Sequence, residues 1–360
     1  MSNQMTSYNP DYTSAPGETL AELLETHGMT QAQLAARTGR PKQHINEIIA
    51  AKAPITHDMA IQLERSLGVP AAFWNNREAR YRENLARRAE HDRLSGQIAW
   101  LREFPLKEMV RWHWLRPTED RVEQVRELLN FFGVASPEQW REIWSSRQFA
   151  FRKSEAFASH LGPLSAWLRR GELVAREIQC QPYDETRFRS SFEKLRQLSC
   201  SADPQEFVPR MVEICAAAGV AVVFVPELTG CRASGVTQWL TPEKALIQLS
   251  LRHKSDDHLW FTFFHEAGHI LLHGKKEVFV EWGASDGEKE QQANRFAAET
   301  LIPAQQWRRI RSLGRYSKVM IRNLAAEARV SPGILVGRLQ HDKLLPPSHC
   351  NDLKRKYEFK

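Results

Sequence analysis

Residues 261–274 read FTFFHEAGHILLHG, with His265 and His269 four residues apart inside an apolar run. This run predicts a buried helix. Residues i and i+4 lie on one helix face, so both imidazoles could bind one ion. Glu266 could reach a water on that ion: zinc lowers the pKa of a bound water, and a neighbouring glutamate can take its proton as the water attacks a carbonyl. The alternative is a pair of core histidines satisfied by hydrogen bonds.

A catalytic zinc site needs a third protein ligand and one open position. Two glutamates, Glu288 and Glu290, follow in the helical segment GEKEQQANRFAAETLIP. Glu290 is better placed, because the 21 residues after His269 leave room for a loop and a second helix. Asn294, one turn later, could hydrogen-bond a ligand and fix its orientation. In the rival interpretation both glutamates mark a solvated helix start, which the helix dipole favours.

A further histidine, His273, stands at i+4 from His269. Its spacing does not fit the longer HExxHxxGxxH pattern. We expect it to support a ligand or to face the substrate.

The two segments together resemble the ImmA/IrrE metallopeptidase family, a gluzincin-like group with HExxH followed by E-x-x-A-N-x-F-A and a proline-terminated apolar run. Glu290, Asn294 and Pro303 match that pattern, as do Ala293, Phe296 and Ala297. The resemblance covers about residues 205–305. It implies Zn²⁺ held by His265, His269 and Glu290, and cleavage of repressors or related regulators.

Three strands are expected before the motif helix, around Ala221–Val225 and within CRASGVTQWL and KALIQLSL. They fit the small sheet that the resemblance implies. We hypothesise that the first two supply a free edge to which an extended peptide adds by main-chain hydrogen bonds.

Near the N-terminus, residues 30–56 read TQAQLAARTGRPKQHINEIIAAKAPIT. Thr30 is a predicted N-cap, and Gly39 ends the first short helix. A three- to four-residue turn and a second helix follow, with Ile45 and Ile48 inward, which is the pattern of a helix-turn-helix. Polar side chains that could reach base edges and phosphates are expected to face outward. The candidates are Arg40, Lys42, Gln43, His44 and Asn46, with Glu47 beside them. Gln31, in the first turn of the preceding helix, is a further candidate. The alternative is a small helical domain used for protein contacts.

This segment resembles the lambda-repressor-like helix-turn-helix family, closest to antitoxin-type regulators of the HigA kind, over about residues 17–85. It departs from the family at Ala50-Ala51, where an Asn-Gly type of turn is usual. The resemblance implies binding of a double-stranded DNA operator as a homodimer.

The chain has 360 residues, a formal charge of +7 and five scattered cysteines without a CxxC pair. The modest basic excess permits nucleic-acid binding without showing it. No membrane span or secretory signal is visible, so we expect a cytoplasmic protein. Trp140, Trp144 and Trp167 stand at helical spacing and are expected to be packing residues rather than a ligand site.

We therefore predict a mainly α protein with an α+β C-terminal part. Its regions are a flexible tail (1–16), an all-α helix-turn-helix domain (17–76), a helical middle region (77–200), a zincin-like metallopeptidase domain with a small β-sheet (201–305) and a basic helical C-terminal region (306–360). The arginine-rich connector could be a dimerisation helix or a spacer, and the basic region could join the peptidase domain or a partner.

The predicted function is a DNA-binding transcription regulator whose zinc-dependent endopeptidase domain hydrolyses a protein substrate, with Glu266 as the catalytic base. The alternative is an antitoxin-like or sensor repressor whose metallopeptidase-like domain binds a ligand or partner without cleaving it. The sequence identifies neither the substrate nor the operator.

Overall fold

The computed structural model of the protein describes residues 14–150, 161–275, 279–281 and 287–359. The chain divides into two compact units, Met1–Ile98 and Ala99–Lys360. Of the expected N-terminal tail, residues 1–13 lie outside the described residues, and the first helix already begins at Pro16.

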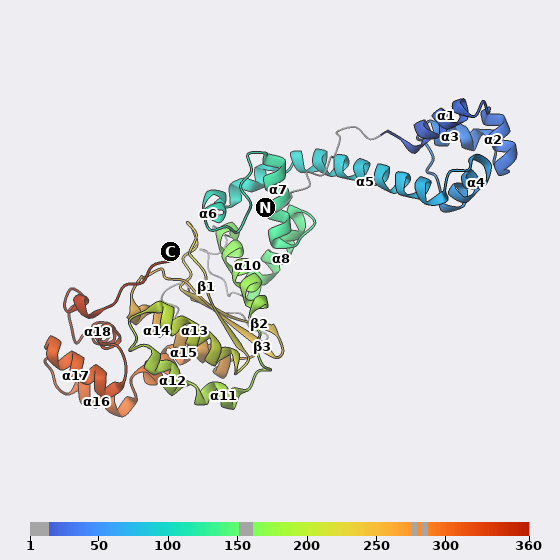
Figure 1. The fold of residues 1–360 in the computed structure, drawn as a ribbon. Coiled ribbons are helices and arrows are strands. Elements are labelled where there is room, and N and C mark those ends of the chain that lie inside the picture. Colours follow the sequence, from blue (N-terminus) through green and yellow to red (C-terminus); the bar gives the residue numbers. More distant parts are fainter. Residues whose placement is uncertain (1–13, 151–160, 276–278, 282–286, 360) are drawn as a thin grey trace, which may run out of the picture. The chain divides into compact units, whose positions relative to one another are not determined.

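The first unit is all helical, as predicted (Figure 1), with α1 (Pro16–Thr26), α2 (Gln31–Thr38), α3 (Lys42–Ile49), α4 (His57–Leu67) and α5 (Ala71–Ser95). The predicted caps are confirmed. The hydroxyl of Thr30 accepts a hydrogen bond from the N–H of Gln33, whose side chain in turn accepts from the N–H of Thr30 at 2.8 Å. Gly39 ends α2 with a φ of 68°, in the left-handed region that glycine adopts without strain. These local signals set the boundaries of α2. The buried side chains of α1 to α4 and of the start of α5 form one hydrophobic cluster, which includes Leu20, Leu24, Leu34, Ile45, Ile48, Met59, Leu63 and Trp74.

Helix α5 is a single element of 25 residues, in which only Trp74 and Leu94 are buried. Between them its surface carries salt bridges at helical spacing, from Arg82 to Glu78 at 2.7 Å and from Arg87 to Glu83 at 2.6 Å. Exposed pairs of this kind contribute only tenths of a kcal/mol each, about 0.3–0.5.

The second unit begins with a helical layer whose packing is largely aromatic: η1 (Ile98–Glu103, starting at the boundary), α6 (Leu106–Arg111), α7 (Arg121–Phe132), α8 (Pro137–Ala150) and α10 (Leu161–Glu177). Trp140 lies between Trp100 and Phe104, with ring centroids 5.6 and 5.1 Å away. Trp140, Trp144 and Trp167 are all buried, which confirms them as packing residues.

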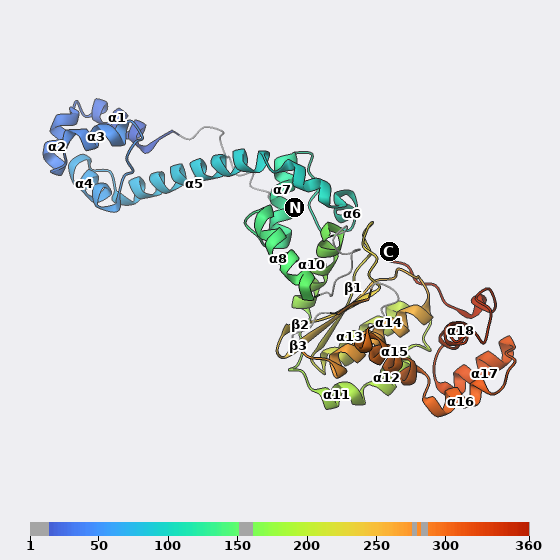
Figure 2. The same cartoon turned by 180° about the vertical axis from the view of Figure 1, so that it is seen from behind.

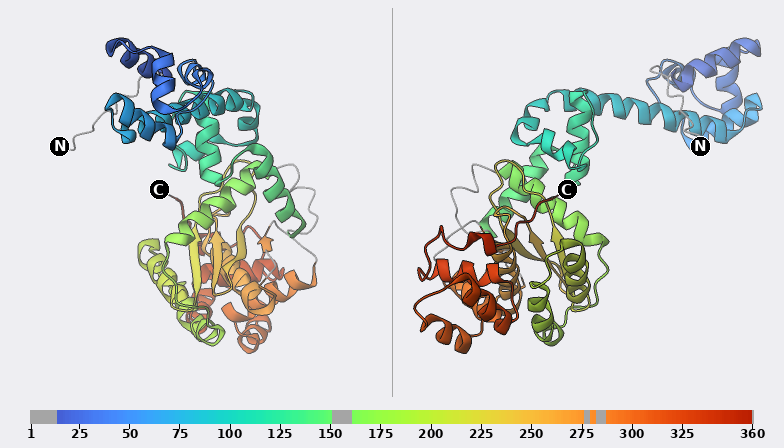
Figure 3. Two further views of the ribbon diagram at one scale, coloured as in Figure 1. Left: turned by 90° about the vertical axis from the view of Figure 1, so that its right-hand side faces the viewer. Right: turned by 60° about the vertical axis from the view of Figure 1, so that its left-hand side comes forward.

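A small sheet follows three further helices, α11 (Glu185–Ser190), α12 (Phe192–Leu198) and α13 (Pro204–Ala216). It consists of β1 (Val220–Phe224), β2 (Gly235–Thr241), β3 (Lys244–Leu249) and β4 (Phe279–Glu281), in the order β1-β3-β2-β4. Strand β1 runs parallel to β3, and the other pairs are antiparallel. Figures 2 and 3 show the sheet within its surrounding helices. The three predicted strands are confirmed, whereas β4 was not expected because it is only three residues long.

The hypothesis of a free edge at the second predicted strand is wrong. Strand β2 has β3 on one side, and on the other side β4 pairs with Gly235, Val236 and Thr237. Among the described strands, β1 and β4 therefore form the edges of the sheet.

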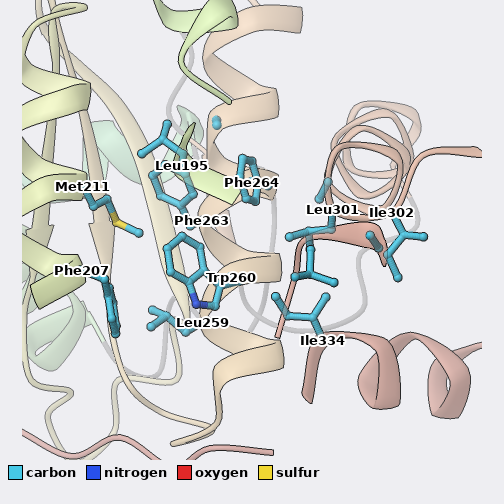
Figure 4. Close-up of a cluster of buried hydrophobic side chains, with 14 of the residues drawn as sticks. Leu195, Phe207, Met211, Leu259, Trp260, Phe263, Phe264, Leu301, Ile302 and Ile334 are labelled. Atoms are coloured by element: carbon cyan, nitrogen blue, oxygen red, sulfur yellow. The ribbon is translucent and has the colours of Figure 1, made fainter. Parts of the chain in front are cut away.

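Both faces of β3 are covered. Ala245, Ile247 and Leu249 point into the main core, while the side-chain amide of Gln248 on the other face donates to the carbonyl oxygen of Trp167 in α10 at 2.8 Å. The main core is organised by α14 (Asp256–Leu272), which carries the HExxH segment. Figure 4 shows Trp260, Phe263 and Phe264 of α14 beside residues of α13 and of the later helices.

Those later helices are α15 (Glu288–Leu301), α16 (Ala304–Arg311), α17 (Lys318–Ala328) and α18 (Pro332–His341), followed by the short η2 (Asn351–Leu353). Ile310, Ile321, Ile334 and Leu335 belong to the same buried cluster as the apolar face of α14. The residues after 304 therefore pack with the HExxH helix.

The start of α14 is held by a segment about a hundred residues later in the chain. The main chains of Asp256 and Arg355 are joined by a hydrogen bond of 2.9 Å, and the N–H of Arg355 donates to the Asp256 carboxylate at 3.1 Å. Lys354 forms a salt bridge of 2.7 Å with Asp257, and the hydroxyl of Ser331 at the start of α18 donates to Asp256 at 2.7 Å. These contacts fix the end of α14 that precedes the histidines.

None of the described helices is both long and apolar enough to cross a membrane.

Candidate metal centre and candidate DNA interface

The two helices that carry the predicted metal ligands pack closely because small residues face each other. A Cβ added at Gly268 of α14 would lie 3.3 Å from the Cα of Ala293 and 3.0 Å from the ring of Phe296 on α15. Ala293 and Ala297 are fully buried along this contact. The close approach brings α15 near enough for its polar side chains to reach the histidines.

His265, His269 and Glu290 converge, with ligand atoms that all lie within 4.8 Å of one another. The two Nε2 atoms are 2.9 Å apart, and the Glu290 oxygens are 3.2 Å from Nε2 of His265 and 3.6 Å from Nε2 of His269. Ligand atoms bound at about 2.0–2.1 Å by a tetrahedral zinc ion would be separated by about 3.3 Å. The three distances therefore fit one zinc ion.

Hydrogen bonds at Nδ1 of His265 and of His269 leave Nε2 of each ring available for a metal. Nδ1 of His265 is 2.9 Å from the side-chain oxygen of Asn294, so Nδ1 carries the proton and donates. Nε2 of His273 faces the side-chain oxygen of Gln292 at 3.3 Å and donates to it, which leaves Nδ1 of His273 to accept from Nδ1 of His269 at 2.9 Å. In both ligand histidines the proton is then on Nδ1 and the lone pair on Nε2, the arrangement that a metal requires.

The charges of the cluster also suit a cation. Burial lowers the pKa of His269 to about 4, so its ring is neutral at neutral pH. Burial alone would raise the pKa of Glu290, but the adjacent imidazoles of His265 and His269 outweigh this effect and lower the pKa to about 2. Neutral imidazoles beside an ionised carboxylate form the protonation state that binds zinc.

Of the three converging side chains, that of Glu290 is the most accessible to solvent. The side chains of His265 and His269 are 2% and 1% exposed, whereas that of Glu290 is 17% exposed. A substrate would therefore approach beside Glu290.

Glu266 is fully buried and packs against β2. Thr237 of that strand donates through its hydroxyl to the main-chain oxygen of Glu266 at 2.9 Å. A Cβ at Gly235 would lie only 2.6 Å from a carboxylate oxygen of Glu266 and 2.6 Å from a methyl group of Thr262. Only glycine at position 235 leaves room for the carboxylate where it lies.

The structure separates the candidates between which the sequence left a choice. Glu290 contacts both histidines, whereas Glu288 accepts a hydrogen bond from Gln292 at 3.3 Å. His273 contacts the ligand His269 from outside and is not itself one of the three converging ligands. Sequence reasoning did not single out Gly235 or Gln292; a glycine at the start of a predicted strand was the one available signal for a close approach at Gly235.

The second candidate site is the surface of α2 and α3 in the first unit. Lys42, Gln43 and Asn46 are exposed on α3, and His44 is half-buried there. Gln43 donates to Glu47 at 3.0 Å, one turn along the same helix. These side chains form a polar face over the buried Ile45 and Ile48, with α2 leading into it; Gln31, half-buried, is the first residue of α2.

Arg40 lies outside the exposed face of α3. It belongs to the three-residue turn between α2 and α3, and its Nε donates to Gln62 of α4 at 2.9 Å. Ala51, at the departure from the family pattern, has a φ of 56°. It adopts the left-handed conformation that glycine or asparagine accommodates more easily.

Comparison with known families places a match on each unit. Residues 20–74 match a helix-turn-helix family, and residues 229–340 match the M78 peptidase family, described as the IrrE N-terminal-like domain. No curated protein matches the chain.

Solved structures of antidote proteins resemble a part of the chain. An addiction module antidote protein of the HigA family from Coxiella burnetii is 27% identical, with a match covering 23% of this chain and 92% of that one and a TM-score of 0.22. A putative antidote protein of a plasmid maintenance system from Nostoc punctiforme is 29% identical, covering 24% and 93% with a TM-score of 0.23. The chain therefore carries a segment similar to the helix-turn-helix family in its first unit and a segment similar to the IrrE N-terminal-like domain of the M78 peptidase family in its second unit.

Proposed function

We propose that this protein is a transcription regulator that binds a DNA operator through α2 and α3 and hydrolyses a peptide bond in a protein substrate at a zinc centre in its second unit. The observation that carries the peptidase part is the convergence of His265, His269 and Glu290 from two helices, with Nε2 available on both rings. The matched M78 family supports it.

His265, His269 and Glu290 would hold a zinc ion, which would supply the Lewis acidity that lowers the pKa of a water molecule to near neutral pH. Glu266, next in the chain to His265, accepts the proton of the attacking water and delivers it to the departing amine. Asn294 and His273 hold the ligand rings in orientation. Packing against Gly235 keeps the Glu266 side chain in place, and Thr237 hydrogen-bonds the main-chain oxygen of Glu266.

In the DNA-binding part, α3 presents Lys42, Gln43 and Asn46 to base edges and phosphates, and Gln31 and His44 flank them. Arg40 contributes by holding the turn to α4 and, when released from Gln62, by reaching a phosphate. The protein binds its operator as a homodimer, as palindromic operators require.

The first test is the metal content of the purified full-length protein by elemental analysis. We expect about one zinc per chain. The zinc-loaded protein is then screened against quenched fluorescent peptides, with Glu266→Gln as the comparison. That variant should retain zinc and lose hydrolysis.

The outcomes separate the two functions considered. Hydrolysis by Glu266→Gln at the native rate would exclude Glu266 as the base. Full zinc occupancy without hydrolysis of any peptide would favour a repressor whose second unit binds a ligand or partner without cleaving it.

DNA binding is tested separately by selection of a bound sequence from random duplexes. Asn46→Ala should weaken binding to that sequence without changing zinc content. Unchanged sequence preference in both Asn46→Ala and Gln43→Ala would rule out α3 as the recognition helix.

A further inference from the structure

The helices after the metal centre carry an unusual concentration of positive charge. From residue 304 to residue 359 there are twelve lysines and arginines and four acidic residues. This surplus of eight exceeds the formal charge of +7 of the whole chain. The basic character of the protein therefore originates in this one region of the second unit.

Part of that charge is neutralised by neighbours. Arg309 pairs with Glu327 at 3.1 Å, Arg329 with Glu193 at 2.9 Å, and Lys318 with Asp352 at 2.9 Å. The remaining cations of α16 and α17 are what a partner could use.

Four arginines remain exposed on this surface, and none of them forms an ion pair within the part of the chain that the structure describes; they are Arg308, Arg311, Arg315 and Arg322, which we call the arginine surface. Arg308 and Arg311 are three residues apart on α16, so they share a face. The chain then turns back on itself, since the hydroxyl of Tyr316 donates to the carbonyl oxygen of Ile310 at 3.1 Å. This turn places Arg315 between the end of α16 and the start of α17.

The two helices are tied together, so the arginines form one surface. The Arg309–Glu327 salt bridge joins α16 to α17, and Figures 1 and 2 show the two helices side by side. Arg322 lies one turn after Lys318 on α17. The hydrogen bond from Lys318 holds the pKa of Asp352 below its usual range, and Arg322 adds to the effect. The four exposed arginines make this surface predominantly positive.

We propose that the arginine surface binds the phosphate backbone of double-stranded DNA, independently of the helix-turn-helix. Arginine presents a planar fork of donors that matches phosphate oxygens. The side chains of Ser317 and Asn323 are also exposed close to these cations in the chain and can donate to the same oxygens. This binding needs neither the metal centre nor α3, so it goes beyond the proposed function.

An acidic protein segment is the other class of partner that positive charge could attract. Leu313 and Val319 are 43% and 65% exposed within the surface and would suit such a partner. The observations favour DNA, because all four unpaired cations are arginines and the chain already carries a helix-turn-helix domain.

The test measures binding of the full-length protein to a short duplex of random sequence by fluorescence anisotropy, between about 50 and 200 mM salt. The variant is R308A/R311A/R315A/R322A. Because each phosphate contact contributes about 0.9 to the slope of log K against log salt, the slope should decrease by about 3 to 4. Binding at low salt should weaken by tenfold or more.

A matched control removes the same charge from four arginines of the second unit that are already paired with carboxylates: R126A/R141A/R189A/R329A. Its slope should stay close to that of the native protein. Replacement of the four surface arginines by lysine should restore most of the slope, which would show that loss of charge, and not misfolding, caused the change.

Equal slopes for the surface variant and the control would overturn the proposal. So would a surface variant that binds DNA like the control but no longer binds poly-glutamate, because the surface would then belong to an acidic protein partner.

Discussion

The helix-turn-helix and the metal centre are both built from two helices, but they use them in opposite ways. Helices α2 and α3 bury Leu34, Ile45 and Ile48 and turn their polar side chains outward. Helices α14 and α15 pack through small residues and turn the polar side chains of the metal centre inward, so that His265 and Glu266 are almost inaccessible. The exposed surface of α3 depends mainly on where that helix lies. The geometry of the buried metal centre depends on every side chain that packs against its ligands. Substitutions should therefore have large effects at the metal centre and small ones at the helix-turn-helix.

The largest effect is expected from Glu290→Ala. The two remaining histidines cannot complete a three-ligand site, so zinc affinity should fall by more than about a hundredfold, since loss of a supporting residue alone costs about 10–100-fold. Elemental analysis after dialysis measures it. Glu288→Ala is the matched control, because Glu288 contacts Gln292 and not the histidines. Equal zinc loss in both variants would contradict the assignment.

The second largest effect is expected from Gly235→Ala. The added methyl group would collide with the Glu266 carboxylate and displace it. A displacement of about 1 Å at a catalytic group lowers the rate by about a hundredfold. We expect zinc content to stay native while hydrolysis of the peptide found with the native protein falls by that factor. A fully active variant would show that the base need not lie against β2.

The protonation of the metal centre predicts acid sensitivity of the metal-free protein. The pKa of His269 is lowered from 6.5 to about 4 and that of Glu290 from 4.5 to about 2, so in both cases the unfolded chain binds more protons than the folded one. Stability is therefore lost as the pH falls, first from 6.5 to 4 and then from 4.5 to 2. Ten of the eleven tryptophans lie after residue 98, so their fluorescence reports unfolding of the second unit. Burial also lowers the pKa of His258, so the variant His269→Ala should lose only part of the pH dependence below 6.5; an unchanged pH profile would refute a contribution from His269.

The helix-turn-helix should respond more weakly. Thr30→Ala removes the hydroxyl acceptor at the start of α2 and should cost about 1 kcal/mol. Hydrogen exchange of the α2 amides measures the change, and zinc content should not alter. A loss of stability as large as that from truncating a core side chain would mean that the helix-turn-helix is as sensitive to substitution as the metal centre.

The smallest expected effect is a gain in the stability of the first unit, from Ala51→Gly. Ala51 holds a φ of 56°, which costs an L residue roughly 1 kcal/mol, so Ala51→Gly should stabilise the first unit by several tenths of a kcal/mol. Ala50→Gly is the control, because Ala50 has a φ of −78° and gains nothing from glycine. Protection of α3 against hydrogen exchange should rise only in the first variant.

The same contrast explains which features could be predicted from the sequence. The boundaries of α2 follow from Thr30 and Gly39, which act on residues within one turn. The HExxH spacing was also recognisable, because helical periodicity brings His265 and His269 to one face, and Glu290 was recognisable from its place in the next helical segment, one turn before Asn294. The contact of Gly235 with Glu266, the pairing of β4 with β2 and the contact of Gln292 with His273 join residues from different elements. The periodicity of residues within one helix or strand carries no information on such contacts, so they could be identified only in the folded structure.

The anchoring of α14 has a consequence for synthesis of the protein. Arg355, which hydrogen-bonds Asp256, is translated 99 residues after it. Until that stretch has left the ribosome, the helix that carries His265 and His269 lacks the partners of its first turn. We expect the nascent chain to complete its DNA-reading unit early and its metal centre late, so that a newly made molecule can hold DNA before it can hold zinc.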